Sequence, residues 1–205
     1  MCGITGFWDF RKITTKADLL KMTDTLAHRG PDDSGIFFDF KQGVGLGHRR
    51  LAIIDLSSQA KQPMGNDSGS IWVTFNGEIY NYRQIREELV CNGHQFRTNS
   101  DTEVILRAYE ECISRFRGMF AFALWDIKHN KLFLVRDRLG VKPLYYYWDG
   151  HLLLFASELR ALEVYREFKR DLDPQSLALY LRFGYVPSPR CIYANTHKVR
   201  PGCYL

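Results

Sequence analysis

Residues 119–125, with the sequence Met-Phe-Ala-Phe-Ala-Leu-Trp, constrain the fold of this chain more than any other segment. Successive side chains of a β-strand point to opposite faces of the sheet. Phe120 and Phe122 would therefore lie on one face of a strand here, and Ala121 and Trp125 would lie on the other. Because both faces are apolar, other parts of the protein must cover both of them. The segment predicts a strand in the middle of a layered structure.

Other segments predict what the layers contain. Asp173 stands at an expected helix N-cap with Pro174 at the first helical position, Asp101 stands at a second N-cap, and Asp149-Gly150 indicates the turn of a β-hairpin. We expect antiparallel sheets with helices outside them, which is an α+β fold. Aromatic and β-branched residues predict strands over 71–75, 118–125, 131–136, 144–148 and 152–156, and apolar spacing predicts helices over 17–27, 80–91 and 101–112.

Composition and charge exclude several classes of function. The chain has 205 residues, of which 45% are hydrophobic and 25% are charged, as in one globular domain with a substantial core. Its longest strongly apolar stretch is too short to cross a bilayer, and residues 1–15 lack the pattern of a secretory signal. We therefore expect a cytoplasmic protein that does not bind a membrane. The formal charge of +5 is modest and mostly scattered, which argues against a nucleic-acid partner.

The five cysteines form no C-x-x-C pair and no cluster with zinc-ligand spacing, so we expect reduced thiols and no metal site. Cys2 differs from the others because removal of Met1 would give it a free α-amine. A thiol has a pKa of about 8.5 and an α-amine one of about 7.7–8.0, so near neutral pH the amine can take the thiol proton. This pairing is one way to activate a nucleophile. Taken alone, an inert buried cysteine is the more frequent case.

Further motifs follow in a fixed order and give Cys2 its context. Together with Cys2 they resemble the class II glutamine amidotransferases, and later segments resemble most closely the N-terminal glutaminase domain of glutamine-hydrolysing asparagine synthetases. The resemblance covers nearly the whole chain. The motifs are His28-Arg29-Gly30-Pro31-Asp32, Gly47-His48-Arg49-Arg50-Leu51-Ala52-Ile53-Ile54-Asp55, Phe75-Asn76-Gly77-Glu78-Ile79-Tyr80-Asn81 and Ser100-Asp101-Thr102-Glu103, followed by segments 118–126, 136–145 and 156–159.

The resemblance implies the N-terminal nucleophile (Ntn) hydrolase fold, a four-layer αββα sandwich of two antiparallel sheets. It implies hydrolysis of glutamine to glutamate and ammonia through a thioester on Cys2. The ammonia would serve the ATP-dependent amidation of aspartate by a C-terminal synthetase domain of the same full-length chain. Because Leu205 falls just after Arg200-Pro201-Gly202, where the family crosses into the synthetase, we expect residues 1–205 to be the glutaminase domain alone. No cofactor is expected in this domain, and ATP and Mg²⁺ would belong to the synthetase domain.

Asn76 and Gly77 are the predicted oxyanion hole. If they end a strand before a helix, the Asn76 side-chain amide and the Gly77 N–H can point at one oxygen, and glycine allows close approach. A hairpin turn is the competing interpretation of Asn-Gly. We favour the oxyanion hole because residues 78–81 have the pattern of a helix start.

Arg50 is the predicted clamp for the substrate carboxylate. Adjacent side chains of a strand face opposite ways, so only one of Arg49 and Arg50 can enter a pocket. The resemblance selects Arg50, whose guanidinium would bind a carboxylate in a bidentate manner. It also implies that Leu51 and Ile53 line the pocket through their carbonyl groups.

Glu78 and Asp101 match the family residues that bind the α-ammonium of the substrate. Asp101 has a competing interpretation as a helix N-cap, a role for which Ser100 also competes. Residues 28–33 stay outside the predicted catalytic set because Arg29 and Asp32 could equally form a structural ion pair. Arg136-Asp137 and Gly140 to Tyr145 recur in the family near the face toward the partner domain, but a turn supported by Pro143 explains this segment equally well.

Alternatives to the asparagine-synthetase assignment remain. The same glutaminase could serve another acceptor, such as a sugar carboxylate in surface-polysaccharide assembly. Residues 117–122 resemble an RNA-binding signature only if one residue is skipped. An inactive interaction domain would retain Met1, which an intact-mass measurement detects. A homodimer is also considered.

Segments between Glu111 and Cys112 and from Ala161 to Arg170 look shorter than in the family.

Overall fold

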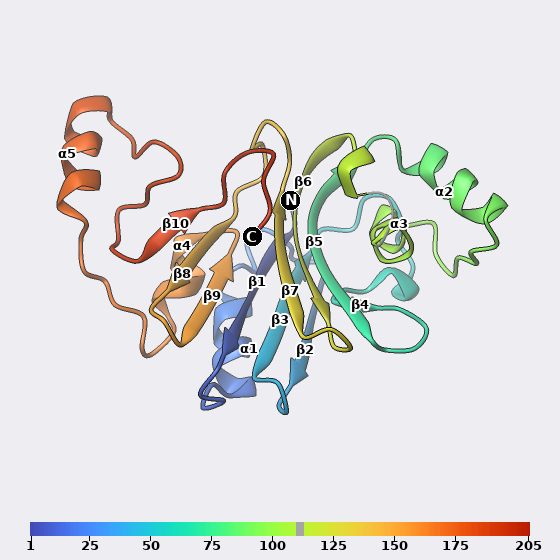
Figure 1. Cartoon of the computed structure of the whole chain (residues 1–205), viewed down its shortest axis with the longest axis horizontal. Helices are drawn as coiled ribbons and strands as arrows, with labels where there is room; N and C mark the ends of the chain where they lie inside the picture. Colours follow the sequence, from blue (N-terminus) through green and yellow to red (C-terminus); the bar gives the residue numbers. More distant parts are fainter. Residues whose placement is uncertain (110–112) are drawn as a thin grey trace.

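Within residues 1–109 and 113–205, which the computed structural model describes, the strands form two antiparallel sheets (Figure 1). The first sheet has the order β10-β8-β9-β1-β3-β2 and the second has the order β4-β5-β6-β7. The strands of the first sheet are β1 (Gly3–Asp9), β2 (Asp33–Asp39), β3 (Val44–Arg50), β8 (Tyr145–Trp148), β9 (Leu152–Ala156) and β10 (Thr196–Lys198). The strands of the second sheet are β4 (Met64–Gly65), β5 (Ile71–Ile79), β6 (Gly118–Asp126) and β7 (Lys131–Arg136).

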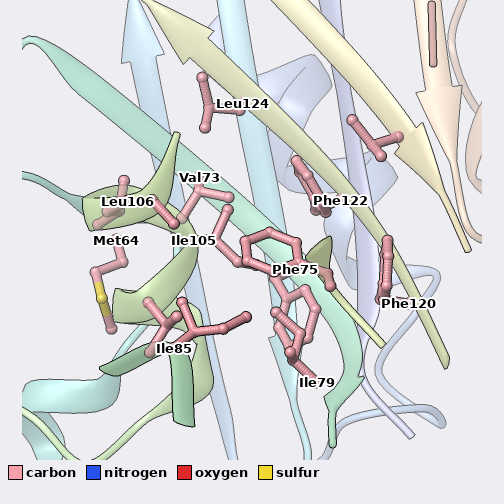
Figure 2. Packing of buried hydrophobic residues seen from close by; sticks show 14 of the residues in the cluster. Met64, Val73, Phe75, Ile79, Ile85, Ile105, Leu106, Phe120, Phe122 and Leu124 are labelled. Atoms are coloured by element: carbon pink, nitrogen blue, oxygen red, sulfur yellow. The ribbon is translucent and has the colours of Figure 1, made fainter. Parts of the chain in front are cut away.

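Helices cover the outer faces of both sheets. Apolar residues of α1 (Lys16–Asp24) and α4 (Leu159–Glu163) form one core with the outer face of the first sheet. Residues of α2 (Tyr82–Cys91) and α3 (Asp101–Ala108) form a second core with the outer face of the second sheet (Figure 2). A third core lies between the two sheets. The predicted four-layer αββα arrangement is therefore confirmed. The remaining elements are η1 (Ser58–Ala60), η2 (Ile113–Arg115) and α5 (Pro174–Phe183).

Strand β6 has the two apolar faces that its sequence predicts. Phe120 and Phe122 point into the core under α2 and α3 (Figure 2). Ala121 and Trp125 belong to the core between the sheets. The RNA-binding interpretation is wrong, because the two phenylalanines are buried and cannot stack on nucleotide bases.

Strand β5 runs four residues further than predicted and includes Asn76 and Gly77, and α2 starts at Tyr82 rather than at residue 80. The reason is pairing with β6, whose register continues to Ile79 opposite Gly118. A Cβ atom at residue 77 would lie 2.3 Å from the carbonyl oxygen of Met119, so only glycine allows the two strands to approach here. The turn interpretation of Asn-Gly is also wrong.

The predicted caps and helix ends are confirmed only in part. Ser100 is the N-cap of α3 and accepts a hydrogen bond from the Thr102 N–H, so the assignment of that role to Asp101 is wrong. Asp173 caps α5, and Pro174 occupies its first turn, as predicted. Helix α1 ends at Asp24, three residues earlier than expected. The predicted helix end at 112 and the short segment between residues 111 and 112 lie outside the described residues.

Helix α5 lies apart from the four layers (Figure 1). Ser176 is its buried residue, whereas Tyr180 and Leu181 are exposed. Its N-terminus is fixed by Asp173, which accepts hydrogen bonds from the backbone and the hydroxyl group of Ser176. The helix therefore contributes little to the core of the domain.

Candidate active site

Strand alternation brings the predicted site residues to one end of the space between the sheets. Ile4 of β1 and Leu46 of β3 belong to the core between the sheets. Because side chains alternate along a strand, Cys2, two residues before Ile4, faces the same space, as does Arg50, four residues after Leu46. The two strands are antiparallel neighbours, and the register places Gly3 opposite Arg49, so the start of β1 meets the end of β3.

The second sheet supplies the facing residues. The Thr74 hydroxyl donates to the Gly47 carbonyl oxygen at 3.1 Å, so this face of β5 is turned toward the first sheet. Asn76 and Glu78 follow at two-residue intervals and face the same way. A cavity of about 180 Å³ lies where these strand ends meet. It is lined by every residue that the sequence predicts for the site: Cys2, Arg50, Leu51, Ile53, Asn76, Gly77, Glu78 and Asp101.

The Cys2 thiol is half-buried against the main chain of Leu51. The Leu51 N–H donates to Sγ at 3.4 Å, and the thiol donates to the Leu51 carbonyl oxygen at 3.6 Å. Burial raises the pKa of the Cys2 thiol, while the Leu51 hydrogen bond, the positive chain terminus and Arg50 act in the opposite direction. In the chain that retains Met1, the thiol is therefore mainly protonated at neutral pH.

Asn76 carries a donor without a partner. Its side chain is 1% exposed, and Nδ2 forms no hydrogen bond to any of the described residues. Buried amide groups are nearly always hydrogen-bonded, so an unpaired one next to a cavity indicates a position reserved for a ligand. Gln62 gives the contrast in the same cavity, because its Nε2 donates to Thr102 at 3.1 Å and its Oε1 accepts from the Phe75 N–H at 2.7 Å.

The Gly77 N–H points to the same edge of β5 as the Phe75 and Ile79 N–H groups, since amide directions repeat every second residue of a strand. The Phe75 N–H donates to Gln62, and the Ile79 N–H donates to Asp101 Oδ2 at 3.0 Å. Phe120, opposite Gly77 in β6, directs its own N–H and carbonyl oxygen to Asp137. The Gly77 N–H is thus directed away from β6, toward the cavity that Asn76 also lines.

Arg49 and Arg50 point in opposite directions, as alternation predicts. Arg50 is 8% exposed, and its guanidinium donates to the carbonyl oxygens of Ser57, at 3.2 Å, and of Asp55. Arg49 turns outward and pairs with Asp24 of α1. Only Arg50 can therefore present a guanidinium to the cavity, although its role as a carboxylate clamp stays a prediction.

Asp101 and Glu78 make the adjacent wall of the cavity anionic. Burial and, to a smaller extent, the nearby Glu78 carboxylate raise the pKa of Asp101 to about 6, against the opposing effect of the hydrogen bond from the Ile79 N–H. An acid with this pKa is mostly ionised at neutral pH and becomes protonated as the pH falls through 6. A bound cation would stabilise its charged form.

Sequence reasoning missed a contact that holds Cys2 in place. Arg29 Nε donates to the Cys2 carbonyl oxygen at 2.8 Å, and its Nη1 pairs with Glu158 Oε1 at 2.9 Å. Asp32 instead accepts the Ala52 N–H at 2.9 Å, so the proposed ion pair between Arg29 and Asp32 is wrong. Arg29 and Glu158 both lie in motif segments, but their separation of 129 positions in the sequence conceals the pairing.

The segment after β7 forms a tight loop, as the turn interpretation predicts. Asp137 accepts hydrogen bonds from the backbone N–H groups of Leu139, Val141 and Lys142. Arg136 closes the loop from the other side by donating to three backbone carbonyl groups. This loop brings Lys142, which was not predicted as a site residue, to the wall of the cavity.

The described residues offer neither a metal-ligand cluster nor a membrane-spanning helix. Among the described residues, no cluster of three or more His, Cys, Asp or Glu side chains could hold a metal ion. None of the helices in this part of the chain has the length and apolar character needed to cross a membrane.

Comparisons with known proteins agree with the geometry. Residues 1–205 match the family described as the glutamine amidotransferase domain. Putative asparagine synthetase (glutamine-hydrolyzing) 2 of Methanocaldococcus jannaschii is 42% identical over 221 residues, covering 97% of this chain and 42% of that protein. Asparagine synthetase (glutamine-hydrolyzing) 1 of Bacillus subtilis is 41% identical over 210 residues, covering 98% of this chain and 33% of that protein.

A solved structure shows the same fold at low sequence identity. Glutamine phosphoribosylpyrophosphate amidotransferase from B. subtilis superposes with a TM-score of 0.66 and 22% identity over 84% of this chain and 46% of that chain. The fold is that of the Ntn-hydrolase amidotransferases. The chain spans less than half the length of each of these relatives.

Proposed function

Because the chain belongs to the glutamine amidotransferase family, we propose that it hydrolyses glutamine to glutamate and ammonia, with Cys2 as the nucleophile once Met1 has been removed. One observation carries the proposal. The buried Asn76 amide has no partner for Nδ2 and lines the same cavity as the Cys2 thiol. A donor held ready beside a nucleophile suits an oxyanion that exists only during the reaction.

The chemistry follows from the groups that line the cavity. The α-amine of Cys2 takes the thiol proton, and Sγ attacks the side-chain amide carbon of glutamine. The electron pair of the C=O bond moves to the oxygen, where Asn76 Nδ2 and the Gly77 N–H stabilise the negative charge. The amine then gives its proton to the leaving nitrogen, the C–N bond breaks, and ammonia departs from a thioester. Water, deprotonated by the same amine, attacks the thioester and releases glutamate and the thiol.

The charges of the cavity match the two ends of the substrate. Glutamine carries a carboxylate and an α-ammonium group on the same carbon. We assign the carboxylate to Arg50 and the ammonium to Glu78 and Asp101, which are the cationic and anionic residues of the wall. The raised pKa of Asp101 supports this assignment, because a site built for a cation leaves its carboxylates poorly stabilised when it is empty.

We further propose that the ammonia passes to a synthetase domain of the same full-length protein, with aspartate as the acceptor. The two relatives named above are called asparagine synthetases and are more than twice as long as this chain, which supports this proposal. ATP and Mg²⁺ would be bound by that further domain, and none of the cavity residues is assigned to them.

A glutaminase assay with two cysteine variants tests the function. Cys2→Ala should abolish glutamate formation while leaving the circular dichroism spectrum unchanged, because the residue lies at the chain terminus. Cys91→Ala is the matched control, since Cys91 is an exposed free thiol on α2, and it should keep full activity. Mass spectrometry must first confirm that Met1 is absent. Activity in Cys2→Ala, or in protein that retains Met1, would contradict the proposal.

A further inference from the structure

Lys142 is a buried cation in the active-site cavity that the proposed reaction leaves unused. The residue is 6% exposed and lines the same cavity as Cys2 and Asn76. Among the described residues its Nζ has one hydrogen-bond partner, the Met1 sulfur atom at 3.4 Å, and no carboxylate forms an ion pair with it. A thioether is a weak acceptor, so the ammonium group is poorly compensated in this structure.

The backbone around Lys142 holds it in this place independently of its side chain. The Lys142 N–H donates to Asp137 Oδ2 at 3.0 Å, and its carbonyl oxygen accepts from Arg136 Nε at 2.8 Å. Buried lysines are rare unless they are paired. A loop built to place an unpaired ammonium here indicates a role for the charge rather than for packing.

The hydrogen-bond partner of Lys142 is Met1, whose removal gives Cys2 its free α-amine. Covalent geometry limits the distance from the Met1 sulfur atom to the Cys2 nitrogen to about 6 Å, so Nζ lies at most about 10 Å from that nitrogen. When Met1 is removed, the Cys2 nitrogen becomes a free amine, and Nζ loses the one acceptor that it has among the described residues. Removal of Met1 thus leaves the ammonium within about 10 Å of the new amine.

We propose that Lys142 is a positioning residue for glutamine hydrolysis: its charge keeps the amine–thiol pair of Cys2 in the singly deprotonated, reactive state at neutral pH. This inference rests on the proposed function of Cys2. The reactive pair carries one proton fewer than the inactive pair of ammonium and thiol, and its net charge falls from +1 to 0. A neighbouring cation favours this loss of charge whichever of the two atoms keeps the remaining proton.

Other charged groups of the cavity also act on the Cys2 thiol, and the effect of Lys142 adds to theirs. Those that line it are Arg50 at the end of β3, Asp55 in the following loop, Glu78 of β5 and Asp101 of α3, whereas β6 contributes the neutral Met119. Arg50 acts in the same direction as Lys142, and its guanidinium is fixed by the carbonyl oxygens of Asp55 and Ser57. The carboxylates act in the opposite direction. Lys142 is therefore the cation that stands on the Met1 side of the nucleophile.

The test measures pH profiles of Lys142→Met and Lys142→Arg in protein shown by mass spectrometry to lack Met1. Methionine keeps the length of the side chain without its charge, and arginine keeps the charge. We expect the acid limb of kcat/KM to move upward by about one pH unit in Lys142→Met, which is roughly a tenfold loss on that limb and little loss at high pH. Lys142→Arg should keep the wild-type limb. An unchanged limb in Lys142→Met, or an equal shift in both variants, overturns the proposal.

Alkylation of Cys2 by iodoacetamide separates this inference from the function on which it rests. The pH dependence of alkylation reports the same deprotonation without glutamine turnover. If the wild-type protein alkylates normally but does not hydrolyse glutamine, the proposed function fails. If it hydrolyses glutamine while the alkylation profile of Lys142→Met matches that of the wild type, the role of Lys142 fails alone.

Discussion

Replacing Asn76 with alanine is expected to separate catalysis from stability. A buried donor without a partner costs about 1–3 kcal/mol of folding free energy, and Nδ2 of Asn76 is such a donor. Alanine removes this cost, and the space that it leaves opens into the existing cavity, where water can enter. The free energy of unfolding should therefore stay within about 1 kcal/mol of the wild-type value. Loss of an oxyanion donor, in contrast, should lower kcat by about 10²–10³-fold, or about 2.7–4 kcal/mol.

Gln62→Ala is the matched control, because its amide lines the same cavity but is bonded at both ends. Its removal leaves the buried Phe75 N–H and the Thr102 hydroxyl without their partners. We expect the free energy of unfolding to fall by about 2–4 kcal/mol, with a smaller loss of kcat than in Asn76→Ala. Asn76→Ala should thus lose mainly kcat, whereas Gln62→Ala should lose mainly free energy of unfolding.

Urea unfolding followed by circular dichroism gives the free energy of unfolding and its dependence on urea for each variant. Steady-state measurement of glutamate formation gives kcat and KM. The reasoning is refuted if Asn76→Ala loses more than about 2 kcal/mol of stability, which would identify the amide as a structural group. It is also refuted if the variant retains the wild-type kcat.

Three further outcomes are expected from the charges around the cavity. Arg50→Lys should raise KM for glutamine more than about tenfold, from the loss of a bidentate pair worth roughly 1.5–3 kcal/mol, whereas Arg49→Lys should be nearly silent; a larger KM defect in the second variant would reverse the assignment. Because the pKa of Asp101 is about 6, glutamine binding should weaken as pH falls through 6 and the carboxyl group becomes neutral, and Asp101→Asn should lose this pH dependence of KM. Protein that retains Met1 should react slowly with iodoacetamide at neutral pH, because burial raises the pKa of the Cys2 thiol; equal alkylation rates with and without Met1, measured by mass spectrometry, would count against this explanation.

Local geometry explains which features could be predicted from the sequence. The alternation of β6 and the opposite directions of Arg49 and Arg50 depend only on the two-residue period of a strand, and both predictions are confirmed. The αββα fold and the location of the site came from the resemblance to a family. The roles of the individual site residues remain predictions that the variants above test.

Contacts between distant segments explain the errors. Asn76 and Gly77 have poor strand propensity, and they remain in β5 because β6, more than forty residues later, pairs with them. The hydrogen bond from Arg29 to Cys2 depends on Glu158, which no local pattern connects to the N-terminus. Asp101 lies one residue after the true N-cap, Ser100, so its position alone suggested a cap. Its carboxylate instead accepts a hydrogen bond from the Ile79 N–H of β5, a contact that the local sequence does not reveal.

The separate position of α5 has a consequence for how the domain opens in solution. A helix of 10 residues is marginal in water without packing, and α5 buries only Ser176. Its amide hydrogens should therefore exchange with deuterium far faster than those of β6, through local opening that leaves the four layers intact. Leu181, 76% exposed, and Tyr180, 50% exposed, already lie on the surface of this helix. Deuterium exchange in α5 should slow when another surface covers these side chains. The exchange rate of this helix therefore indicates whether its exposed face is in contact with another molecule or domain.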